Sequence, residues 1–400
     1  MDNKYVNGVL TIYLDDHLDS SNVDNVRQYV QEKISENPTR EVYFDCEKLC
    51  SITAEGYELI KDIKKEFEVY VLNVSDDMYS KMDADRFTRD VHVRRKMRCL
   101  SAKDLEIIGV GASSYVHRYD DDTMIKAFFP AVSLDRIYAE TESARKSLVA
   151  GINTAIPFDI CRCDDGYATL FELIEGGSLG KNLMEQPEAF DEFMTKYIAL
   201  LKQFHTTPAE MGAFPDIRDK YHGWMDGLKK YMTEEEVSQL YELFDVIPFR
   251  QTMIHVDPHV GNIMVDENRE LIFVDMADIS IGHPLIDVGT EYFHYIISRE
   301  TCLGAKLIFA VEPEDHELPV KVWNALEKGY FAGKSEEQMK DIHNMLKYFG
   351  GFRCLIIVAK HAQLADDVKM ELVEKQRKEL MPFIDEAKEL FARADEFFTD

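Results

Sequence analysis

The segment from Ile254 to Asn262, taken together with Asp275, constrains this chain more than any other feature. Asn262 lies five residues after Asp257, and Asp275 lies eighteen residues after it. An amide oxygen and a carboxylate are hard ligands that suit Mg²⁺, and a second carboxylate can accept the proton of an attacking hydroxyl. The order and spacing therefore predict a phosphoryl-transfer centre, with Asp257 as the base and Asn262 and Asp275 as Mg²⁺ ligands.

The residues between Asn262 and Asp275 follow a hairpin pattern. Apolar residues dominate 262–265 and 271–274, and turn-forming residues fill 266–269. This pattern predicts a β-hairpin whose ends bring Asn262 and Asp275 together. An ordinary Asp/Asn turn between two core strands is the alternative, because short motifs also match by chance.

Upstream, the sequence predicts a strand, a slim turn and a second strand around Gly109, Gly111, Ala112 and Ser113. Such a turn lets phosphates approach the backbone closely. The Gly-Lys-Ser/Thr ending of a P-loop is absent, which disfavours a Walker-type NTPase. A third predicted strand follows and contains one lysine, Lys126, among apolar neighbours. A lysine in that setting is costly to bury unless it is paired.

The acidic partner of Lys126 is predicted in the helical segment 134–148. Glu142 is the preferred partner and Glu140 the alternative, and the sequence does not separate them. An apolar strand then leads into a Gly-Gly-Ser break, where Ser178 is predicted to cap the next helix.

Residues from about 104 to 290 resemble the aminoglycoside phosphotransferase and choline kinase-like superfamily. The resemblance is carried by Gly109-Val110-Gly111-Ala112-Ser113, Met124-Ile125-Lys126, His255-x-Asp257-x-His259-x-Gly261-Asn262, and Asp275 followed by Gly282-His283-Pro284-Leu285-Ile286-Asp287. It implies an α+β protein-kinase-like bilobal fold, with an N-lobe at 104–175 and a largely helical C-lobe at 176–400. The absence of Asp-Phe-Gly and Ala-Pro-Glu segments favours the small-molecule branch over the protein kinases.

The resemblance also implies roles for single residues. Asp257 is the base and Lys126 binds the α- and β-phosphates of ATP. Glu172 to Ile174 form the hinge whose backbone contacts adenine, and Val116 and Met264 sandwich the ring. The remaining residues of the motif are His255 and Asp287, expected to brace the catalytic loop, and His259, expected either to brace it or to contact the substrate.

The first hundred residues alternate strands and helices, which indicates a small α/β sheet. Residues 1–92 resemble a STAS domain, and 93–103 are the predicted linker. The carriers are Leu18-Asp19-Ser20-Ser21-Asn22, Phe44-Asp45-Cys46-Glu47-Lys48-Leu49 and Ile52-Thr53-Ala54-Glu55-Gly56. Ala54 stands where the STAS proteins that switch by phosphorylation carry serine, so this domain is expected to bind a protein partner or to self-associate.

Composition excludes several classes of protein. The formal net charge of −28 argues against nucleic acid and anionic membranes as partners, and it leaves room for a cationic substrate. No apolar run is long enough to span a membrane, no signal peptide is visible, and the seven cysteines show no zinc-site spacing. A cytoplasmic location with reduced thiols is expected.

Near the C-terminus, apolar residues recur at helical spacing and are expected to face a core: Phe383, Ala387, Leu390, Phe391, Ala394 and Phe397. The leading functional hypothesis is an ATP- and Mg²⁺-dependent kinase of a small hydroxylated molecule, such as an aminoglycoside, amino alcohol or sugar. The alternatives are an ATP-binding regulatory adaptor that acts through the STAS-like domain, and a protein Ser/Thr kinase.

Overall fold

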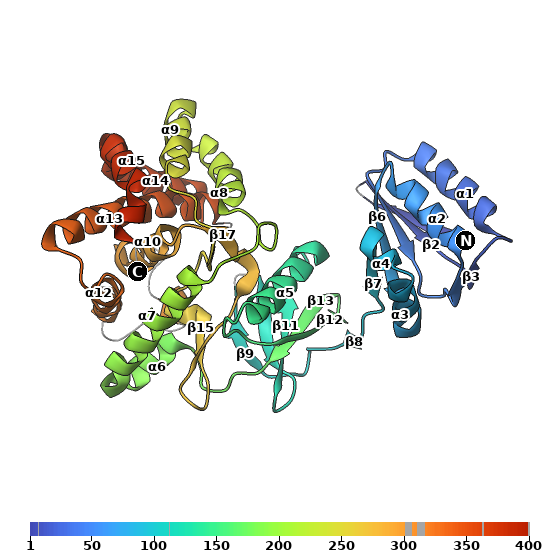
Figure 1. The fold of residues 1–400 in the computed structure, drawn as a ribbon, viewed down its shortest axis with the longest axis horizontal. Helices are drawn as coiled ribbons and strands as arrows, with labels where there is room; N and C mark the ends of the chain where they lie inside the picture. The colour runs from blue at the N-terminus through green and yellow to red at the C-terminus, as the bar shows by residue number, and fades with distance from the viewer. Residues whose placement is uncertain (7, 112, 301–305, 310–316, 362–363, 399–400) are drawn as a thin grey trace. The chain divides into compact units, whose positions relative to one another are not determined.

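The chain forms two compact units, Met1–Leu100 and Ser101–Asp400. The computed structural model describes residues 1–6, 8–111, 113–300, 306–309, 317–361 and 364–398. Figure 1 labels the helices and strands of both units.

The first unit is a five-stranded sheet in the order β1-β2-β4-β6-β7, flanked by helices. Strands β2, β4, β6 and β7 run parallel to one another, and β1 pairs antiparallel with β2. Parallel strands need helical crossovers, which explains the alternating pattern of the sequence. The elements are β1 (Asp2–Val6), β2 (Val9–Tyr13), β3 (His17–Leu18), α1 (Val23–Glu36), β4 (Glu41–Asp45), β5 (Ser51–Ile52), α2 (Ala54–Lys64), β6 (Glu68–Val74), α3 (Asp76–Ala84), α4 (Phe87–Asp90), β7 (His92–Arg95) and β8 (Cys99–Leu100).

The predicted linker is partly a strand. Residues 93–95 lie in β7, which pairs with β6, so they belong to the sheet of the first unit. The basic side chains of this segment contact that unit: Arg94 lies over the ring of Tyr70, and Arg95 over that of Tyr79. Their attraction to aromatic faces, together with backbone pairing, extends the domain beyond residue 92.

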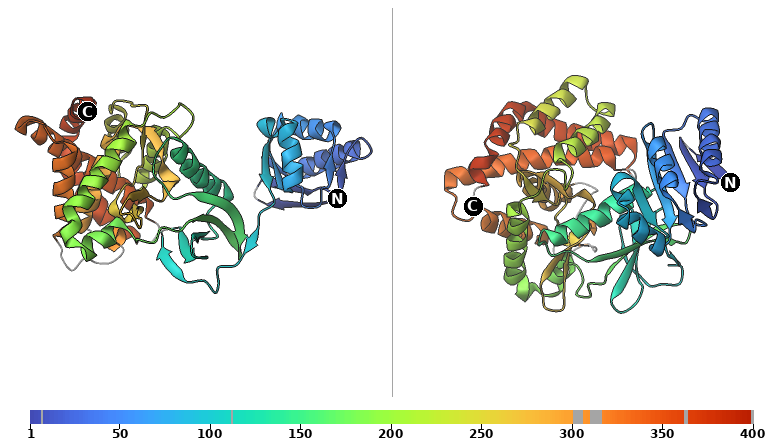
Figure 2. Two further views of the ribbon diagram at one scale, coloured as in Figure 1. Left: turned by 60° about the horizontal axis from the view of Figure 1, so that its bottom comes forward. Right: turned by 45° about the vertical axis from the view of Figure 1, so that its right-hand side comes forward.

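The second unit begins with an antiparallel sheet whose strands follow the order β12-β13-β11-β10-β9. Helix α5 packs on this sheet, as the teal and green segments of Figure 2 show. The elements are β9 (Ile107–Val110), β10 (Ser114–Arg118), β11 (Thr123–Phe128), α5 (Leu134–Val149), β12 (Pro157–Cys163) and β13 (Gly166–Glu172). The predicted strand, turn and strand around Gly109 and Gly111 are confirmed as β9 and β10.

The rest of the second unit is mainly helical. Its elements are α6 (Leu179–Glu185), α7 (Phe190–Thr206), α8 (Ile217–Met225), α9 (Glu234–Asp245), β14 (Thr252–Ile254), β15 (Ile263–Val265), β16 (Leu271–Phe273), β17 (Ser280–Gly282), α10 (Leu285–Tyr292), α11 (Lys306–Phe309), α12 (Leu318–Tyr330), α13 (Glu336–Lys360), α14 (Asp366–Leu380), α15 (Ile384–Ala392) and α16 (Ala394–Phe397). Short 3₁₀ turns include η3 (Val260–Asn262) and η4 (Met276–Asp278), and a π-helical turn, η5, covers Phe293–Ile297.

Several local expectations can be compared with these elements. The hairpin is confirmed, because β15 and β16 pair with Ile263 opposite Phe273. Ser178 caps α6 through the Lys181 N–H, as predicted. Phe383 is an exception among the C-terminal apolar residues: it is 48% exposed, because it ends a separate 3₁₀ turn before α15 begins. Among the described residues, no helix is long and apolar enough to cross a membrane.

Candidate active site

Lys126 on β11 is the meeting point of two carboxylates. Its ammonium donates to Glu140 on α5 and, at 3.0 Å, to Asp275 Oδ1. Glu140 is buried, whereas the carboxylate of Asp275 is 48% exposed. The preference for Glu142 was therefore wrong. Residue 142 is two positions further along α5, which turns its side chain away from residue 140, and it pairs weakly with Arg145 instead.

Lys126 and Asp275 favour each other's charged form, whereas burial and the charge of Asp275 raise the pKa of Glu140. Burial disfavours the charged ammonium, but Asp275 and Glu140 outweigh burial and raise the pKa of Lys126 above its ordinary value. The charge of Lys126 in turn lowers the pKa of Asp275. Lysine and aspartate are therefore both ionised at neutral pH, and the ion pair joins the β-rich part of the unit to the 3₁₀ turn η4.

Replacing Glu140 with glutamine is expected to lower kcat/KM for ATP by about 10- to 100-fold, because a charge-assisted bond of roughly 1.5–3 kcal/mol to Lys126 is lost. Glu142→Gln is the matched control on the same helix and should leave kcat/KM within about twofold of wild type. Steady-state kinetics with varied ATP measure both variants. Equal effects in the two variants would contradict the pairing.

The catalytic loop contains a strained residue held by a buried carboxylate. Val256 has a φ of 77°, a left-handed conformation that β-branched residues rarely adopt. The Asp287 carboxylate accepts the N–H groups of His255 at 2.8 Å and Val256 at 2.7 Å. It also bonds to His205 Nε2 at 3.0 Å. Asp287 thus braces the turn that presents Asp257.

Two histidines contact Asp257. His294 Nε2 lies 2.6 Å from Asp257 Oδ1, and His259 Nε2 lies 3.7 Å from Oδ2. Burial opposes ionisation of Asp257, but His294 and His259, together with Arg353, keep its pKa well below the ordinary value. His294 belongs to the π-helical turn η5, and π-turns are frequent at functional sites.

The same three side chains could in principle hold a metal ion, since their ligand atoms lie within 4.8 Å of one another. The tautomer of His259 argues against it. Its Nδ1 accepts the Gly261 N–H at 3.1 Å, so in the neutral ring Nε2 carries the proton and faces Asp257. Burial lowers the pKa of His259 to about 4, which keeps that ring neutral. His259 therefore acts as a brace of the loop.

Asn262 and Asp275 lie at the same end of the hairpin. The Val274 N–H donates to the Asn262 carbonyl at 2.9 Å, and Asp275 is the next residue. The Asn262 amide nitrogen donates to the Asp257 carbonyl at 2.9 Å, so the Oδ1 of Asn262 remains the side-chain atom for a cation. His255 Nε2 bonds to the Val274 carbonyl at 3.1 Å and fixes the strand end. An amide oxygen beside an exposed carboxylate is a donor set that fits Mg²⁺.

The predicted phosphate loop lies between β9 and β10. The Gly111 N–H donates to the Ser114 carbonyl at 2.9 Å, and the Ser113 carbonyl accepts from Phe129. Ala112 lies outside the described residues. Val116 on β10 is directly opposite Lys126 on β11, which puts both side chains on one face of the sheet. A Cβ on Gly109 or Gly111 would make only ordinary van der Waals contacts, so neither position sterically requires glycine. The advantage of glycine at both positions is its small size.

The predicted hinge has fewer free backbone groups than expected. The Glu172 N–H donates to the Ile156 carbonyl and the Leu173 N–H to the Asp122 carbonyl, which leaves Ile174 as the hinge amide outside these two bonds. Gly176, two residues after Ile174, packs against the hairpin: a Cβ at this position would lie 2.1 Å from the Val265 carbonyl oxygen. Only glycine fits there, and this close approach places Met264 beside the hinge.

A buried acid behind the catalytic loop was not anticipated. Glu291 on α10 accepts the Tyr197 hydroxyl at 2.6 Å, and the same hydroxyl lies 3.1 Å from the Pro258 carbonyl. Tyr295 accepts the Val260 N–H at 3.0 Å. Burial raises the pKa of Glu291 to about 8. The protonated acid therefore belongs to the folded state, while the unfolded chain would release the proton near 4.5.

Because Glu291 binds its proton more tightly when folded, the stability it contributes is full at low pH and is lost as pH rises toward 8. Relative to Glu291→Gln, wild type should lose roughly 2–5 kcal/mol of unfolding free energy between about pH 5 and pH 8. Urea unfolding of both proteins across this range measures the difference. A constant difference would show that the pKa of Glu291 does not change on folding.

A buried arginine also escaped sequence analysis. Arg353 on α13 is 5% exposed and donates through Nη2 to the Val256 carbonyl at 3.4 Å. Its Nε and Nη1 are buried without a partner. One signal was visible: it is a lone charge within an apolar run from Gly350 to Val358. His294 had no comparable signal, because its contact with Asp257 depends on how α10 and η5 pack.

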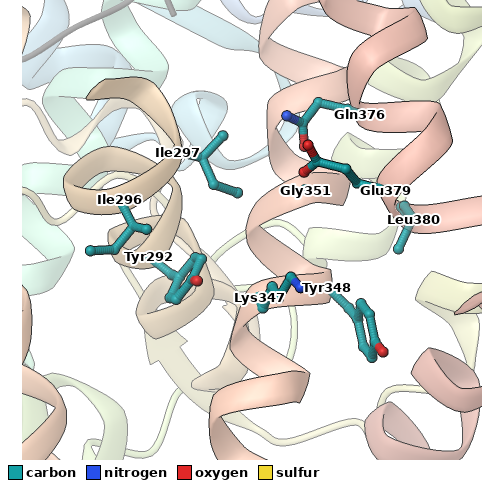
Figure 3. A pocket seen from close by; sticks show the side chains of 9 residues that line it. All are labelled: Tyr292, Ile296, Ile297, Lys347, Tyr348, Gly351, Gln376, Glu379 and Leu380. Carbon is teal, nitrogen blue, oxygen red and sulfur yellow. The ribbon is translucent and has the colours of Figure 1, made fainter. Parts of the chain in front are cut away.

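A cavity of about 300 Å³ lies on another side of η5 (Figure 3). Tyr292, Ile296 and Gly351 line it. Each of the first two is two residues from His294, which points them away from Asp257. None of the predicted site residues lines this cavity, so it is distinct from the site around Asp257.

Comparison with known proteins agrees with this arrangement. A model of the phosphotransferase enzyme family matches residues 104–308, and a model of the STAS domain matches residues 1–98. No curated protein sequence matches the chain.

Aminoglycoside phosphotransferases are among the solved structures that a comparison finds similar to this chain. The ADP-bound aminoglycoside phosphotransferase APH(2'')-Ib has 13% identity and a TM-score of 0.46, with 80% of this chain and 99% of that chain covered. Spectinomycin phosphotransferase APH(9)-Ia, in complex with ADP and spectinomycin, has 10% identity and a TM-score of 0.40, with 71% and 93% covered. Because its family model matches more than half of the residues, this chain belongs to the phosphotransferase enzyme family, and it carries a STAS domain at its N-terminus.

Proposed function

We propose that this protein is a phosphotransferase that moves the γ-phosphate of ATP to a hydroxyl of a small molecule. The observation that carries the proposal is the convergence of two carboxylates on Lys126, beside a catalytic loop that presents Asp257. The two clusters interact, since the charge of Asp257 acts on Asp275. A lysine between a helix glutamate and a metal-binding aspartate is the arrangement that kinases use for the phosphates of ATP.

Each residue then has a role set by its position. Glu140 holds the ammonium of Lys126 in place for the α- and β-phosphates. Asn262 and Asp275 would hold Mg²⁺, which when bound would supply positive charge near the transferred group. Val116 and Met264 contact adenine, and the Ile174 backbone supplies the hinge contact.

Asp257 accepts the proton of the acceptor hydroxyl. Its low pKa keeps the carboxylate ionised, and the bond from His294 fixes Oδ1. Oδ2, which lies 3.7 Å from His259 Nε2, accepts the proton of the hydroxyl. Asp287 holds the strained backbone at Val256 so that the carboxylate keeps this orientation. A base that is held in place in this way contributes typically 10²–10⁴-fold to the rate.

The test is a screen of small hydroxylated molecules with Mg-ATP, in which ADP formation is measured with and without each acceptor. At least one acceptor should raise ADP formation, and chelation of Mg²⁺ should abolish it. Mg-ATP binding without transfer to any acceptor would contradict the proposal.

An adaptor that binds ATP and acts through the STAS domain is the second candidate. It is favoured by Ala54, the exposed first residue of α2, which offers no hydroxyl for a phosphate. Thr53 precedes it and uses its hydroxyl on Glu55 at 2.7 Å. A stoichiometric protein partner that binds the isolated first unit, without any effect of Asp257→Ala, would support the adaptor.

A further inference from the structure

Two cations, Arg353 and Lys360, stack against one aromatic ring, that of Trp224, near the catalytic loop. Arg353, which bonds to the Val256 carbonyl, has its guanidinium 5.3 Å from the centre of the Trp224 ring. The ammonium of Lys360 lies 3.5 Å from the centre of the same ring. Lys360 and Arg353 are seven residues apart on α13, which is about two turns, so they share one side of that helix.

Arg353, the more buried of these two cations, is in an unusual environment. Arg353 is more than nine-tenths buried, and its Nε and Nη1 have no hydrogen-bond partner. Among the described residues it forms no ion pair with a carboxylate, although its charge acts at longer range on Asp257, whose pKa it helps to keep low. Burying a charge without a counter-ion is costly, and such charges normally sit where a ligand or another charge compensates them.

Further basic residues surround the same site. Lys220, one turn before Trp224 on α8, donates to the Asp278 carbonyl at 2.8 Å and pairs with the Asp278 carboxylate at 3.4 Å, and Asp278 ends the turn that follows Asp275. Arg136 on α5 is exposed. Partial burial of the Lys360 ammonium, together with the charge of Arg353, lowers the pKa of Lys360 to about 8. The charges of Asp278, Arg136 and Asp257 also affect this pKa.

These charges contrast with the composition of the whole chain, which has 74 acidic residues and 46 basic ones. Lys360 and Arg353, which form no ion pair among the described residues, add positive charge near the catalytic base, and this favours an anion over an amine there. The nucleotide has its own cation, Lys126, which is paired with Glu140 and Asp275. Lys360 and Arg353 on α13 are therefore available to the acceptor, whereas Lys220 on α8 is paired with Asp278.

We propose that the acceptor carries an anionic group, phosphate or carboxylate, which binds at Lys360 and Arg353 while its hydroxyl faces Asp257. The inference rests on the proposed phosphotransferase function and narrows its acceptor class. It runs against the cationic substrate that the overall charge of the chain left open. Lys360 is the specificity-determining residue that contacts the anion. Arg353, which is buried, adds to the positive electrostatic potential at that position.

The experiment compares molecules that share one scaffold and differ in charge. Glucose, glucosamine, glucuronate and glucose 1-phosphate form one set, and glycerol, serinol, glycerate and glycerol 3-phosphate form another. Transfer from Mg-ATP is measured for wild type. Binding of each molecule is measured by calorimetry on Asp257→Asn protein saturated with a non-hydrolysable ATP analogue, so that the affinity does not depend on turnover. The anionic members should bind at least about tenfold more tightly than the neutral and cationic ones.

The variant that tests the site is Lys360→Gln, an exposed substitution that should not disturb folding. It should raise KM for the anionic acceptor about tenfold and leave KM for ATP unchanged. Lys321→Gln is the matched control, because Lys321 is also an exposed lysine over an aromatic ring, 4.0 Å from the centre of Phe190. That control should match wild type. Comparing glucuronate and glycerate with the two phosphate esters shows whether the site prefers a carboxylate or a phosphate.

The failures can be told apart. If transfer depends on Asp257 but amines or neutral molecules are preferred, or Lys360→Gln is silent, this inference falls and the proposed function stands. If no transfer occurs and yet anions bind in a Lys360-dependent manner, the anion site is supported and the proposed function falls. If every anionic member fails to bind at millimolar concentration, the inference is overturned.

Discussion

Replacing Asp257 with alanine is expected to lower kcat by about 10²–10⁴-fold, because the group that accepts the hydroxyl proton is lost. The affinity for Mg-ATP should change by less than about threefold, since Lys126, Asn262 and Asp275 keep their places. The Asn262 side chain depends on the backbone carbonyl of residue 257 and not on its carboxylate. Rapid-quench or steady-state rates give kcat, and fluorescence titration with a nucleotide analogue gives Kd.

A second variant separates loss of the base from loss of structure. Asp257→Asn keeps the size of the side chain and can still meet His294 Nε2, yet it cannot take a proton at neutral pH. Its kcat should fall as far as that of Asp257→Ala, and its melting temperature should stay closer to wild type. If Asp257→Asn retained full activity, Asp257 would only be a structural residue of the loop.

Replacing Asp287 with alanine is expected to lower the free energy of unfolding by about 3–5 kcal/mol. Asp287 is fully buried, and its carboxylate serves the N–H groups of His255 and Val256 as well as His205. Without it, these buried donors have no acceptor, and the strained conformation of Val256, which itself costs about 1–3 kcal/mol, loses its support. Urea unfolding followed by circular dichroism measures the change, and kcat should fall because Asp257 is no longer held.

Another Asp–His pair provides the control. Asp245 bonds to His222 Nε2 at 2.7 Å, but both side chains are well exposed. Asp245→Ala should change the unfolding free energy by less than about 1 kcal/mol, because exposed pairs contribute little. Similar losses in the two variants would mean that burial of Asp287 is not what makes its bonds matter.

Local sequence patterns predicted well those parts of the fold that depend on segments close together in the chain. The β15–β16 hairpin follows from two apolar stretches around a polar turn, and a hairpin joins residues that are close in the chain. The small α/β sheet of the first unit follows from its regular alternation of strands and helices. Both are confirmed. The end of the first domain was misplaced, because β7 is a short basic strand with little apolar pattern.

Side-chain partners were harder to predict than elements. Glu140 and Glu142 lie on one helix with the same composition around them, and only the rotation of α5 against the sheet selects Glu140 for Lys126. The contacts of Arg353 with Val256 and of His294 with Asp257 join residues far apart in the chain. Their distances depend on helix packing, which no short motif records.

The sequence by itself determined which chemical groups are present and in what order: a lysine on a strand, the carboxylate proposed as the base, and an amide and a carboxylate at the ends of a hairpin that are proposed as Mg²⁺ ligands. These are set locally, by spacing along the backbone. Tertiary structure alone decided which glutamate meets Lys126, how Asp287 holds the strained loop, and which unpaired cations stand beside Asp257. Burial and long-range packing set those distances, and the electrostatic effects that follow depend on distance and not on position in the chain.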